Sequence, residues 1–225
     1  MDNVNTQMSN SYLTYLRVKR AIYLLLKRIL DIIISVIGIV LLIPIAIIIK
    51  IAYMCTGDFH SIILTQDRIG RGGKNFKFYK FRSMIPNADE ALFKALAKDE
   101  KLAEEYAINK KLKNDPRITK VGKVIRKLSL DETPQFINIF LGDMTLIGNR
   151  PYLPREKKDM GDSFDEIVRT KPGLTGYWQV SGRSDVSFKK RLELEAYYSR
   201  HSGFKMDIKI FFKTFKVVIC GRGAN

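Results

Sequence analysis

Two adjacent carboxylates, Asp131 and Glu132, have the type and position that covalent chemistry on a phosphate would require. They precede Thr133, Pro134 and an apolar stretch, which predicts the start of a helix. The free N–H groups of a helix start keep a carboxylate ionised, and an ionised carboxylate can attack phosphorus as a nucleophile. The neighbouring carboxylate can bind Mg2+ together with phosphate oxygens of a substrate.

The same pair has a purely structural interpretation. Asp131 or Thr133 can cap the predicted helix, with Pro134 in its first turn. Taken alone, the pair favours capping, because caps are far commoner than nucleophiles. The residues around the pair must therefore decide between the two interpretations.

Three arginines are placed where they could neutralise a diphosphate. Arg126 lies shortly before Asp131, whereas Arg150 and Arg183 lie in segments rich in glycine. A guanidinium group can bind phosphate through two parallel hydrogen bonds. A single arginine is most often a surface residue. The arginines together with the carboxylate pair and an uncharged membrane segment favour an enzyme that acts on a diphosphate.

Several other kinds of site are missing from the sequence. There is no GxxxxGK[ST] segment and no GxGxxG after a strand, and His60 and His201 are too few for a histidine ligand set. Cys55 and Cys220 have no disulfide or metal-ligand spacing, and a reducing compartment fits them. These features disfavour a nucleotide-fold, P-loop or zinc mechanism.

Length and charge restrict the class of protein. A chain of 225 residues can bury one sizeable core, which predicts one catalytic domain with an attached membrane element. Its 39 Lys and Arg residues against 23 Asp and Glu residues give a formal charge of +16. This charge predicts an anionic partner and leaves nucleic acid, anionic lipid and phosphorylated substrates open.

The N-terminal quarter contains a membrane segment. Residues 32–49 are apolar and uncharged, which is long enough to enter a bilayer. Residues 12–28 combine apolar and basic side chains, as in helices at an anionic membrane surface. Residues 1–11 are polar, and we expect a disordered leader there. The apolar segment starts late and lacks a cleavage pattern, so a removed signal peptide is disfavoured.

Basic residues flank the apolar segment on both sides, and the positive-inside tendency would keep both flanks in the cytoplasm. A helix that enters the membrane, bends and leaves by the same face satisfies this condition. Pro44 can supply the break, because proline removes a backbone donor and clashes with the preceding turn. A crossing helix with a tolerated proline is an equally favoured alternative.

The remaining sequence predicts a short strand and several helices. Alternating aromatic and basic residues predict a strand within 74–84, and the composition of 88–113 predicts a largely solvated helix. Helical spacing continues at 121–128. The helix that opens at Asp131 is expected to stop at Gly142.

Two Gly- and Pro-rich segments, 148–154 and 171–183, are predicted as loops that contact a ligand through exposed backbone donors. Two further helices are expected at 187–201 and 206–219. The apolar face of the last helix could complete the core, and the lysines beside it would also suit a membrane surface.

Four long segments, in this order, resemble the bacterial sugar transferases, also called monotopic phosphoglycosyl transferases. They are KRILDIIISVIGIVLLIPI, KFYKFRSM, DPRITKVGKVIRKLSLDETPQFINIFLGDMTLIGNRP and KPGLTGYWQVSGRSD. The resemblance extends from about Lys27 to the C-terminus, which makes it far more specific than a single short motif.

The resemblance implies that Asp131 is the nucleophile, which displaces a nucleoside monophosphate and carries the sugar phosphate. Glu132 would be the Mg2+ partner, and Arg126 would contact phosphate. Undecaprenyl phosphate would approach from the bilayer and attack the phospho-aspartate. The family's helix-break-helix hairpin agrees with the charges around Pro44. The residues assigned to substrate binding are Lys80, Arg82, Arg126, Arg150, Pro151, Gln179 and Arg183.

Two positions depart from the family pattern. Members often have Ser-Pro at the helix break and GPRP in the loop, whereas this chain has Ile43 before Pro44 and Asn149 in GNRP. Loss of the serine removes a side chain that could satisfy backbone groups at the break. The segment KPGLTGYWQVSGRSD is most similar to members that use UDP-galactose or UDP-glucose, and galactose is the first expectation.

The predicted protein is α+β and mostly helical, with a single catalytic domain, an N-terminal re-entrant membrane helix-break-helix and amphipathic interfacial helices. Its expected parts are a polar leader and basic interfacial segment (1–28), a membrane helix broken at Pro44 (29–54) and a cytoplasmic phosphoglycosyl transferase domain (55–225). The expected reaction transfers a sugar 1-phosphate from a UDP-sugar to undecaprenyl phosphate and releases UMP. It would be the first membrane step in assembling an exopolysaccharide, capsule or O-antigen type glycan.

The expected partners are the UDP-sugar, undecaprenyl phosphate, Mg2+ and anionic lipids of the bacterial inner membrane, without nucleic acid and with an oligomer left open. Two alternatives belong to other classes. One is a membrane-tethered basic binding or scaffold protein in which the carboxylates only cap a helix. The other is a single-crossing signalling or assembly protein.

Overall fold

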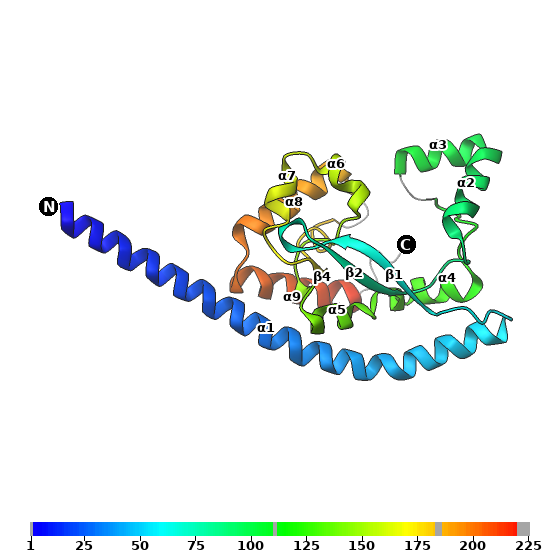
Figure 1. Ribbon diagram of the computed structural model, residues 1–225, viewed down its shortest axis with the longest axis horizontal. Helices are drawn as coiled ribbons and strands as arrows, with labels where there is room; N and C mark the ends of the chain where they lie inside the picture. Colours follow the sequence, from blue (N-terminus) through cyan, green and yellow to red (C-terminus); the bar gives the residue numbers. More distant parts are fainter. Residues whose placement is uncertain (1, 110–111, 183–185, 220–225) are drawn as a thin grey trace. The chain divides into compact units, whose positions relative to one another are not determined.

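The structure is a computed structural model that describes residues 2–109, 112–182 and 186–219 (Figure 1). Its described part is mostly helical with two small sheets, which confirms the predicted α+β class. The chain divides into two compact units. Among the described residues, unit 1 lies within 2–40, 66–78 and 135–219, and unit 2 lies within 41–65 and 79–134.

The N-terminal helix α1 extends from Asp2 to Cys55. Its exposed side chains between residues 29 and 54 are mostly large and apolar, and the helix is long and apolar enough to cross a membrane. The prediction of a disordered leader at 1–11 is wrong, because α1 already includes Asp2 and the residues after it. Extending a formed helix avoids the entropic cost of nucleating a new first turn.

Pro44 lies inside α1 and does not end it. The predicted helix-break-helix is therefore corrected to one continuous helix with an internal proline. Proline withholds an N–H group from the carbonyl of Val40, and the helix nevertheless continues on both sides, as apolar helices with prolines commonly do. The re-entrant course is a question of membrane topology and stays a prediction.

A stripe of charged side chains on α1 binds the rest of unit 1. The ammonium group of Lys27 donates to the carboxylate of Asp207 (2.5 Å) and to the carbonyl of Ile147 (2.6 Å). The guanidinium group of Arg28 donates to the carbonyl of Ile139 (2.6 Å). Hydrogen bonds with a charged partner are stronger than neutral ones, so these contacts fix α1 within the unit.

The buried stripe continues toward the apolar half of α1. Asp31 is 4% exposed and accepts the N–H group of Leu146 (2.9 Å). A methyl group at Gly38 would lie 2.4 Å from the ring of Phe136, so α1 approaches α5 (Gln135–Leu141) closely at a glycine. One face of α1 is therefore used for protein contacts, whereas its apolar faces stay exposed.

The first sheet consists of β1 (Ile63–Ile69) and β2 (Asn75–Phe81), which are joined through the 3-10 turn η1 (Arg71–Gly73). β2 confirms the strand predicted within 74–84. β1 has no counterpart among the predicted elements, because its buried and exposed positions do not alternate.

The second sheet and a helical layer form the core of unit 1. Strands β3 (Thr145–Ile147) and β4 (Gly173–Thr175) pair in parallel, with Thr145 opposite Gly173. The helical elements after β3 are η3 (Pro154–Glu156), α6 (Lys157–Met160), α7 (Ser163–Ile167), α8 (Phe188–His201) and α9 (Phe204–Ile219). α8 and α9 confirm the last two predicted helices.

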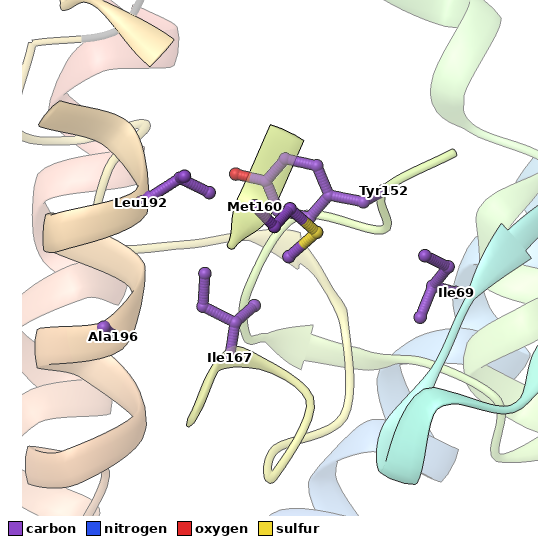
Figure 2. Packing of buried hydrophobic residues seen from close by; sticks show 6 residues of the cluster. All are labelled: Ile69, Tyr152, Met160, Ile167, Leu192 and Ala196. Carbon is purple, nitrogen blue, oxygen red and sulfur yellow. The ribbon is translucent and has the colours of Figure 1, made fainter. Parts of the chain in front are cut away.

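The main apolar cluster of unit 1 lies between α8 and β1. Figure 2 shows Tyr152, Met160 and Ile167 between Leu192 and Ala196 of α8 on one side and Ile69 of β1 on the other; all six residues are buried. The cluster joins the loop after β3 to α6, α7 and α8, and so fixes the position of that loop.

The Gly- and Pro-rich segments lie directly against each other. The N–H group of Gly148 donates to the carbonyl of Thr175 (2.9 Å), and that of Gly173 donates to the carbonyl of Asn149 (2.7 Å). A methyl group at Gly148 would lie 2.4 Å from the carbonyl oxygen of Lys171. These glycines therefore have a structural role in close backbone packing, beside the predicted contact with a ligand.

Unit 2 contains α2 (Ala88–Lys98), α3 (Glu100–Asn109), α4 (Lys120–Lys127) and the 3-10 turn η2 (Leu130–Glu132). The prediction of one helix over 88–113 is wrong, because Asp99 separates α2 from α3. Asp99 has an extended backbone, and its carboxylate accepts the N–H groups of Lys101 (3.0 Å) and Leu102 (3.2 Å). Aspartate favours such a helix start over a helix interior.

The apolar face of α9 lies largely outside the core. Ile210 is fully buried, but Phe211, Phe212 and Phe215 are 48%, 67% and 60% exposed. The alternative that this face completes the core is therefore wrong for the three phenylalanines. Their placement at a membrane surface stays a prediction.

We expect the substitution Gly148→Ala to lower the free energy of unfolding by about 2 kcal/mol, since a methyl group there would overlap the carbonyl of Lys171 and overpacking typically costs about 1–3 kcal/mol. Thermal unfolding of the detergent-solubilised protein measures the change. Gly203→Ala is the matched control, because a methyl group at Gly203 meets nothing closer than 4.0 Å. Equal Tm values for the two variants would contradict the close approach.

Candidate active site

Asp131 lies in η2, a turn that is separate from the α-helix that follows. The predicted helix opening at Asp131 is corrected accordingly: α5 begins at Gln135 and ends at Leu141. The predicted stop at Gly142 is confirmed, because Gly142 has a positive φ of 91° that suits glycine at a helix end.

The backbone around η2 does not have the geometry of a simple cap. Ser129, just before the turn, has a positive φ of 54°, which is unfavourable for a residue with a side chain. Thr133 has a helical backbone (φ −62°, ψ −30°) and lies two residues before the start of α5, whereas an N-cap residue has an extended backbone directly before its helix. The capping role proposed for Thr133 is therefore wrong, and strained backbone is common at functional sites.

Burial and two cations act in opposite directions on Asp131. Burial raises the pKa of its carboxyl group above the usual value, and the charge of Arg126, the residue's own N–H group and the charge of Lys80 lower it. The protein therefore keeps a partly desolvated carboxylate beside positive charge. This is the environment in which an ionised nucleophile is both reactive and stabilised.

Arg126 is held in position by Ser83, in the segment that follows β2. Its Nε donates to the hydroxyl group of Ser83 (2.9 Å). A methyl group at Gly122 would lie 1.9 Å from the carbonyl oxygen of Ser83, so α4 lies directly against this segment. The hydroxyl group of Thr119 caps α4 by accepting the N–H group of Gly122 (2.8 Å). Sequence reasoning missed Ser83, although it lies in the quoted segment KFYKFRSM.

Arg82, which was predicted to bind substrate, is engaged by other groups of unit 2. Its guanidinium group donates to both carboxylate oxygens of Asp58 (2.8 and 3.0 Å) and to the carbonyl of Ser61 (2.8 Å). It also lies 4.3 Å from the ring of Tyr53. Since all its nitrogens donate within unit 2, Arg82 has little capacity left for a phosphate.

The donor set for Mg2+ is small. Within the described residues, no group of three or more His, Cys, Asp and Glu side chains is arranged to hold a metal ion. The exposed Glu132 beside Asp131 still fits Mg2+, because this ion commonly binds one or two carboxylates, several waters and substrate phosphates.

The other predicted binding residues lie in unit 1. The N–H group of Arg150 donates to Glu195 (2.9 Å), and the carbonyl of Pro151 accepts from Arg68 (2.9 Å). The amide of Gln179 makes a long hydrogen bond to a carbonyl (3.4 Å). Arg183 lies outside the described residues. The structure thus brings Lys80, Arg126 and Asp131 together in unit 2 and places Arg150, Pro151 and Gln179 in unit 1.

Glu195 is a buried carboxylate that sequence reasoning missed. It is 1% exposed, and burial raises its pKa to about 7 despite the N–H group of Arg150 and the nearby charges of Arg150 and Arg191. Nothing in the helical pattern of α8 distinguishes it from an ordinary surface glutamate. Only the contact with Arg150 reveals its role in holding the GNRP loop.

A cavity of about 470 Å3 in unit 2 is lined by Tyr53, Thr56, Asp58, Thr119, Lys120 and Val121. None of the residues predicted to act in chemistry or binding lies in this lining. The carboxylate pair therefore has to meet a substrate outside this cavity.

Comparison with known proteins identifies a family. A family model described as bacterial sugar transferase matches residues 22–221. The undecaprenyl-phosphate galactose phosphotransferase of Salmonella typhimurium is 45% identical over 199 residues, which cover 88% of this chain and 41% of that protein. Exopolysaccharide production protein ExoY of Sinorhizobium fredii is 37% identical over 198 residues, which cover 88% of this chain and 87% of that protein.

Galactosyl transferase CpsE of Streptococcus agalactiae is 38% identical over 224 residues, which cover 99% of this chain and 49% of that protein. This chain thus spans less than half of the Salmonella and Streptococcus relatives and most of the Sinorhizobium one. The family match includes Arg126, Asp131, Glu132 and both Gly-rich segments, and it confirms the resemblance seen in the sequence. This chain belongs to the bacterial sugar transferase family.

Proposed function

We propose that the protein transfers a sugar 1-phosphate from a UDP-sugar to undecaprenyl phosphate and releases UMP. The observation that carries this proposal is the half-buried carboxylate of Asp131 in the charge field of Arg126, whose Nε is held by the hydroxyl group of Ser83 (2.9 Å). Family membership and the printed names of the relatives support the substrate classes.

In the first step, a carboxylate oxygen of Asp131 attacks the phosphorus that carries the sugar. A new P–O bond forms to Asp131, and the bond between this phosphorus and the bridging oxygen breaks, so that UMP leaves with the electron pair. Arg126 and Lys80 lie where they can offset charge that develops on the phosphoryl oxygens. Splitting the transfer into two displacements makes each barrier lower than that of one direct step.

In the second step, a phosphate oxygen of undecaprenyl phosphate attacks the same phosphorus. The bond to Asp131 breaks, which restores the carboxylate and yields the lipid diphosphate sugar. The apolar exposed faces of α1 would place this reaction at the bilayer. We further propose that the catalytic residues face the cytoplasm of a bacterial inner membrane, where nucleotide sugars are available.

Glu132 would hold Mg2+ together with phosphate oxygens of the substrate, and the ion would supply charge neutralisation on the diphosphate. UDP-galactose is the first candidate donor. The names of the Salmonella and Streptococcus relatives refer to galactose, and the segment around Trp178 is the part of the chain that resembles galactose- and glucose-using members.

We expect the substitution Asp131→Asn to reduce UMP release at least about a thousandfold, because an amide cannot serve as the nucleophile. The assay contains full-length protein in detergent, Mg2+, UDP-galactose and undecaprenyl phosphate, and it measures UMP and UDP separately. Asp159→Asn is the matched control, since Asp159 is an exposed carboxylate of α6. Near-normal UMP release by Asp131→Asn would exclude the covalent mechanism.

The same assay separates the binding-protein alternative. A membrane-tethered basic scaffold would release no UMP with any of a panel of UDP-sugars. It would instead bind polyanions of any kind with a steep dependence on salt concentration. This combination of results would contradict the enzyme proposal.

The pH dependence of the reaction tests the role of Arg126. The rate constant kcat/KM should fall as the pH drops through the pKa of Asp131, because protonation removes the nucleophile. Arg126 lowers this pKa, so Arg126→Gln should move the acid limb to higher pH and should also lower the maximum rate. Lys127→Gln is the control, because Lys127 is an exposed neighbour on α4. If kcat/KM fell at the same acidic pH in both variants, the role of Arg126 would be contradicted.

A further inference from the structure

A cluster of buried polar groups in unit 1 contains more unpaired donors than acceptors. Its members are Arg150, Tyr152, Trp178, Arg191 and Glu195. Within the described part of the chain, Nε of both arginines and Nε1 of Trp178 are buried donors without a hydrogen-bond partner. The side chains of Tyr152 and Glu195 interact with each other through a hydrogen bond, so they leave these three donors without an acceptor. Buried donors of this kind normally have partners, so their number in one place needs an explanation.

Trp178 brings the two cations of the cluster together. The guanidinium carbon of Arg191 lies 4.5 Å from the centre of the Trp178 ring, and that of Arg150 lies 6.0 Å from it. Trp178 is 8% exposed, so the cluster is largely shielded from water. Burial, and next the charge of Arg150, lower the pKa of Arg191. The two cations therefore destabilise each other in the absence of a further anion.

Glu195 does not balance these charges. It is one carboxylate against two guanidinium groups, and its Oε1 already accepts the backbone N–H group of Arg150 (2.9 Å). Its raised pKa also reduces its negative charge at neutral pH. A buried cation without full compensation costs free energy, and this cost falls when an anion with several acceptor oxygens binds.

We propose that Arg150, Trp178 and Arg191 form a subsite for a phosphoryl anion, in which Arg191 is a further substrate-binding residue. Both arginines are partly exposed, which leaves them open to a ligand from outside the cluster. A phosphoryl group supplies several acceptor oxygens to the planar guanidinium forks and to the indole N–H group. This inference rests on the proposed function, because the proposed reaction supplies the anion. The anion is a phosphate of the nucleotide donor or the phosphate of the lipid acceptor.

The single tryptophan of the sequence makes a direct binding test feasible. Trp178 is the only one in the chain, so tryptophan fluorescence, excited at a wavelength that tyrosine does not absorb, reports on this cluster alone. Full-length protein is titrated with UMP, with uridine, and with phosphatidylcholine vesicles with or without undecaprenyl phosphate. Calorimetry gives each Kd independently. We expect UMP or undecaprenyl phosphate, but neither uridine nor plain vesicles, to change the fluorescence. The responding ligand identifies the source of the anion, and no response to either would overturn the proposal.

Three substitutions separate anion binding from a structural role. We expect Arg191→Gln to raise the Kd of the responding ligand about tenfold or more, because it removes a charge-assisted bidentate contact. Arg200→Gln, an exposed arginine of the same helix, should leave Kd unchanged. Glu193→Gln, an exposed carboxylate of the same helix, should also retain binding. An unchanged Kd in Arg191→Gln would mean that the arginines only compensate Glu195.

Arg191→Lys is the second variant if Arg191→Gln does not fold. Lysine keeps the charge but lacks the planar fork, so an intermediate Kd is expected and an unchanged one counts against the subsite. UMP release is measured on the same preparations. Arg191-dependent binding without UMP release would contradict the proposed reaction and leave the subsite standing. Normal UMP release with a Kd that does not depend on Arg191 would contradict the subsite and leave the proposed reaction standing.

Discussion

The constraint on which this protein's site depends is an ionised carboxylate that has been partly removed from water. Burial raises the pKa of Asp131, so the chain must supply positive charge to keep it ionised. Arg126 and Lys80 supply that charge, and Ser83 fixes Arg126 through its hydroxyl group (2.9 Å). Gly122 allows α4 to lie against the Ser83 segment. The segment after β2, α4 and η2 therefore form one arrangement around Asp131 in unit 2.

The same physical principle applies to α1 in unit 1. Charged groups are costly in an apolar environment unless they have partners, and Lys27, Arg28 and Asp31 all bind groups of the unit. The apolar faces of the helix stay exposed. The proposed transfer of a soluble phosphosugar to a lipid would need polar contacts and apolar surface in the same protein. In α1, both occur on one helix, which ties the apolar segment directly to the core that holds the GNRP loop.

The sequence predicts the elements that have a clear hydrophobic periodicity or a residue that ends a helix. It does not predict the elements that form through contacts between residues distant in sequence. β2, α4, α8 and the end of α5 follow local signals, whereas β1 does not alternate and β3 and β4 are three residues each. In the site, Asp131, Arg126 and Lys80 were identified from residue types and from the family resemblance. Ser83 and Glu195 act through partners 43 and 45 residues away, and no local pattern reveals such contacts. Arg82 lies in the segment KFYKFRSM that carries the resemblance, and no local pattern there reveals that its donors already have partners in unit 2.

The central claim is that Asp131 becomes covalently bonded to phosphorus during turnover. Mass spectrometry of the intact protein tests it most directly, after brief mixing with UDP-galactose and Mg2+ in the absence of undecaprenyl phosphate and rapid quenching. The account predicts a species heavier by one sugar phosphate, which fragmentation assigns to Asp131 and which disappears when undecaprenyl phosphate is added. Accumulation of the lipid product by the same preparation, with no adduct on Asp131 at any time point, would contradict the account.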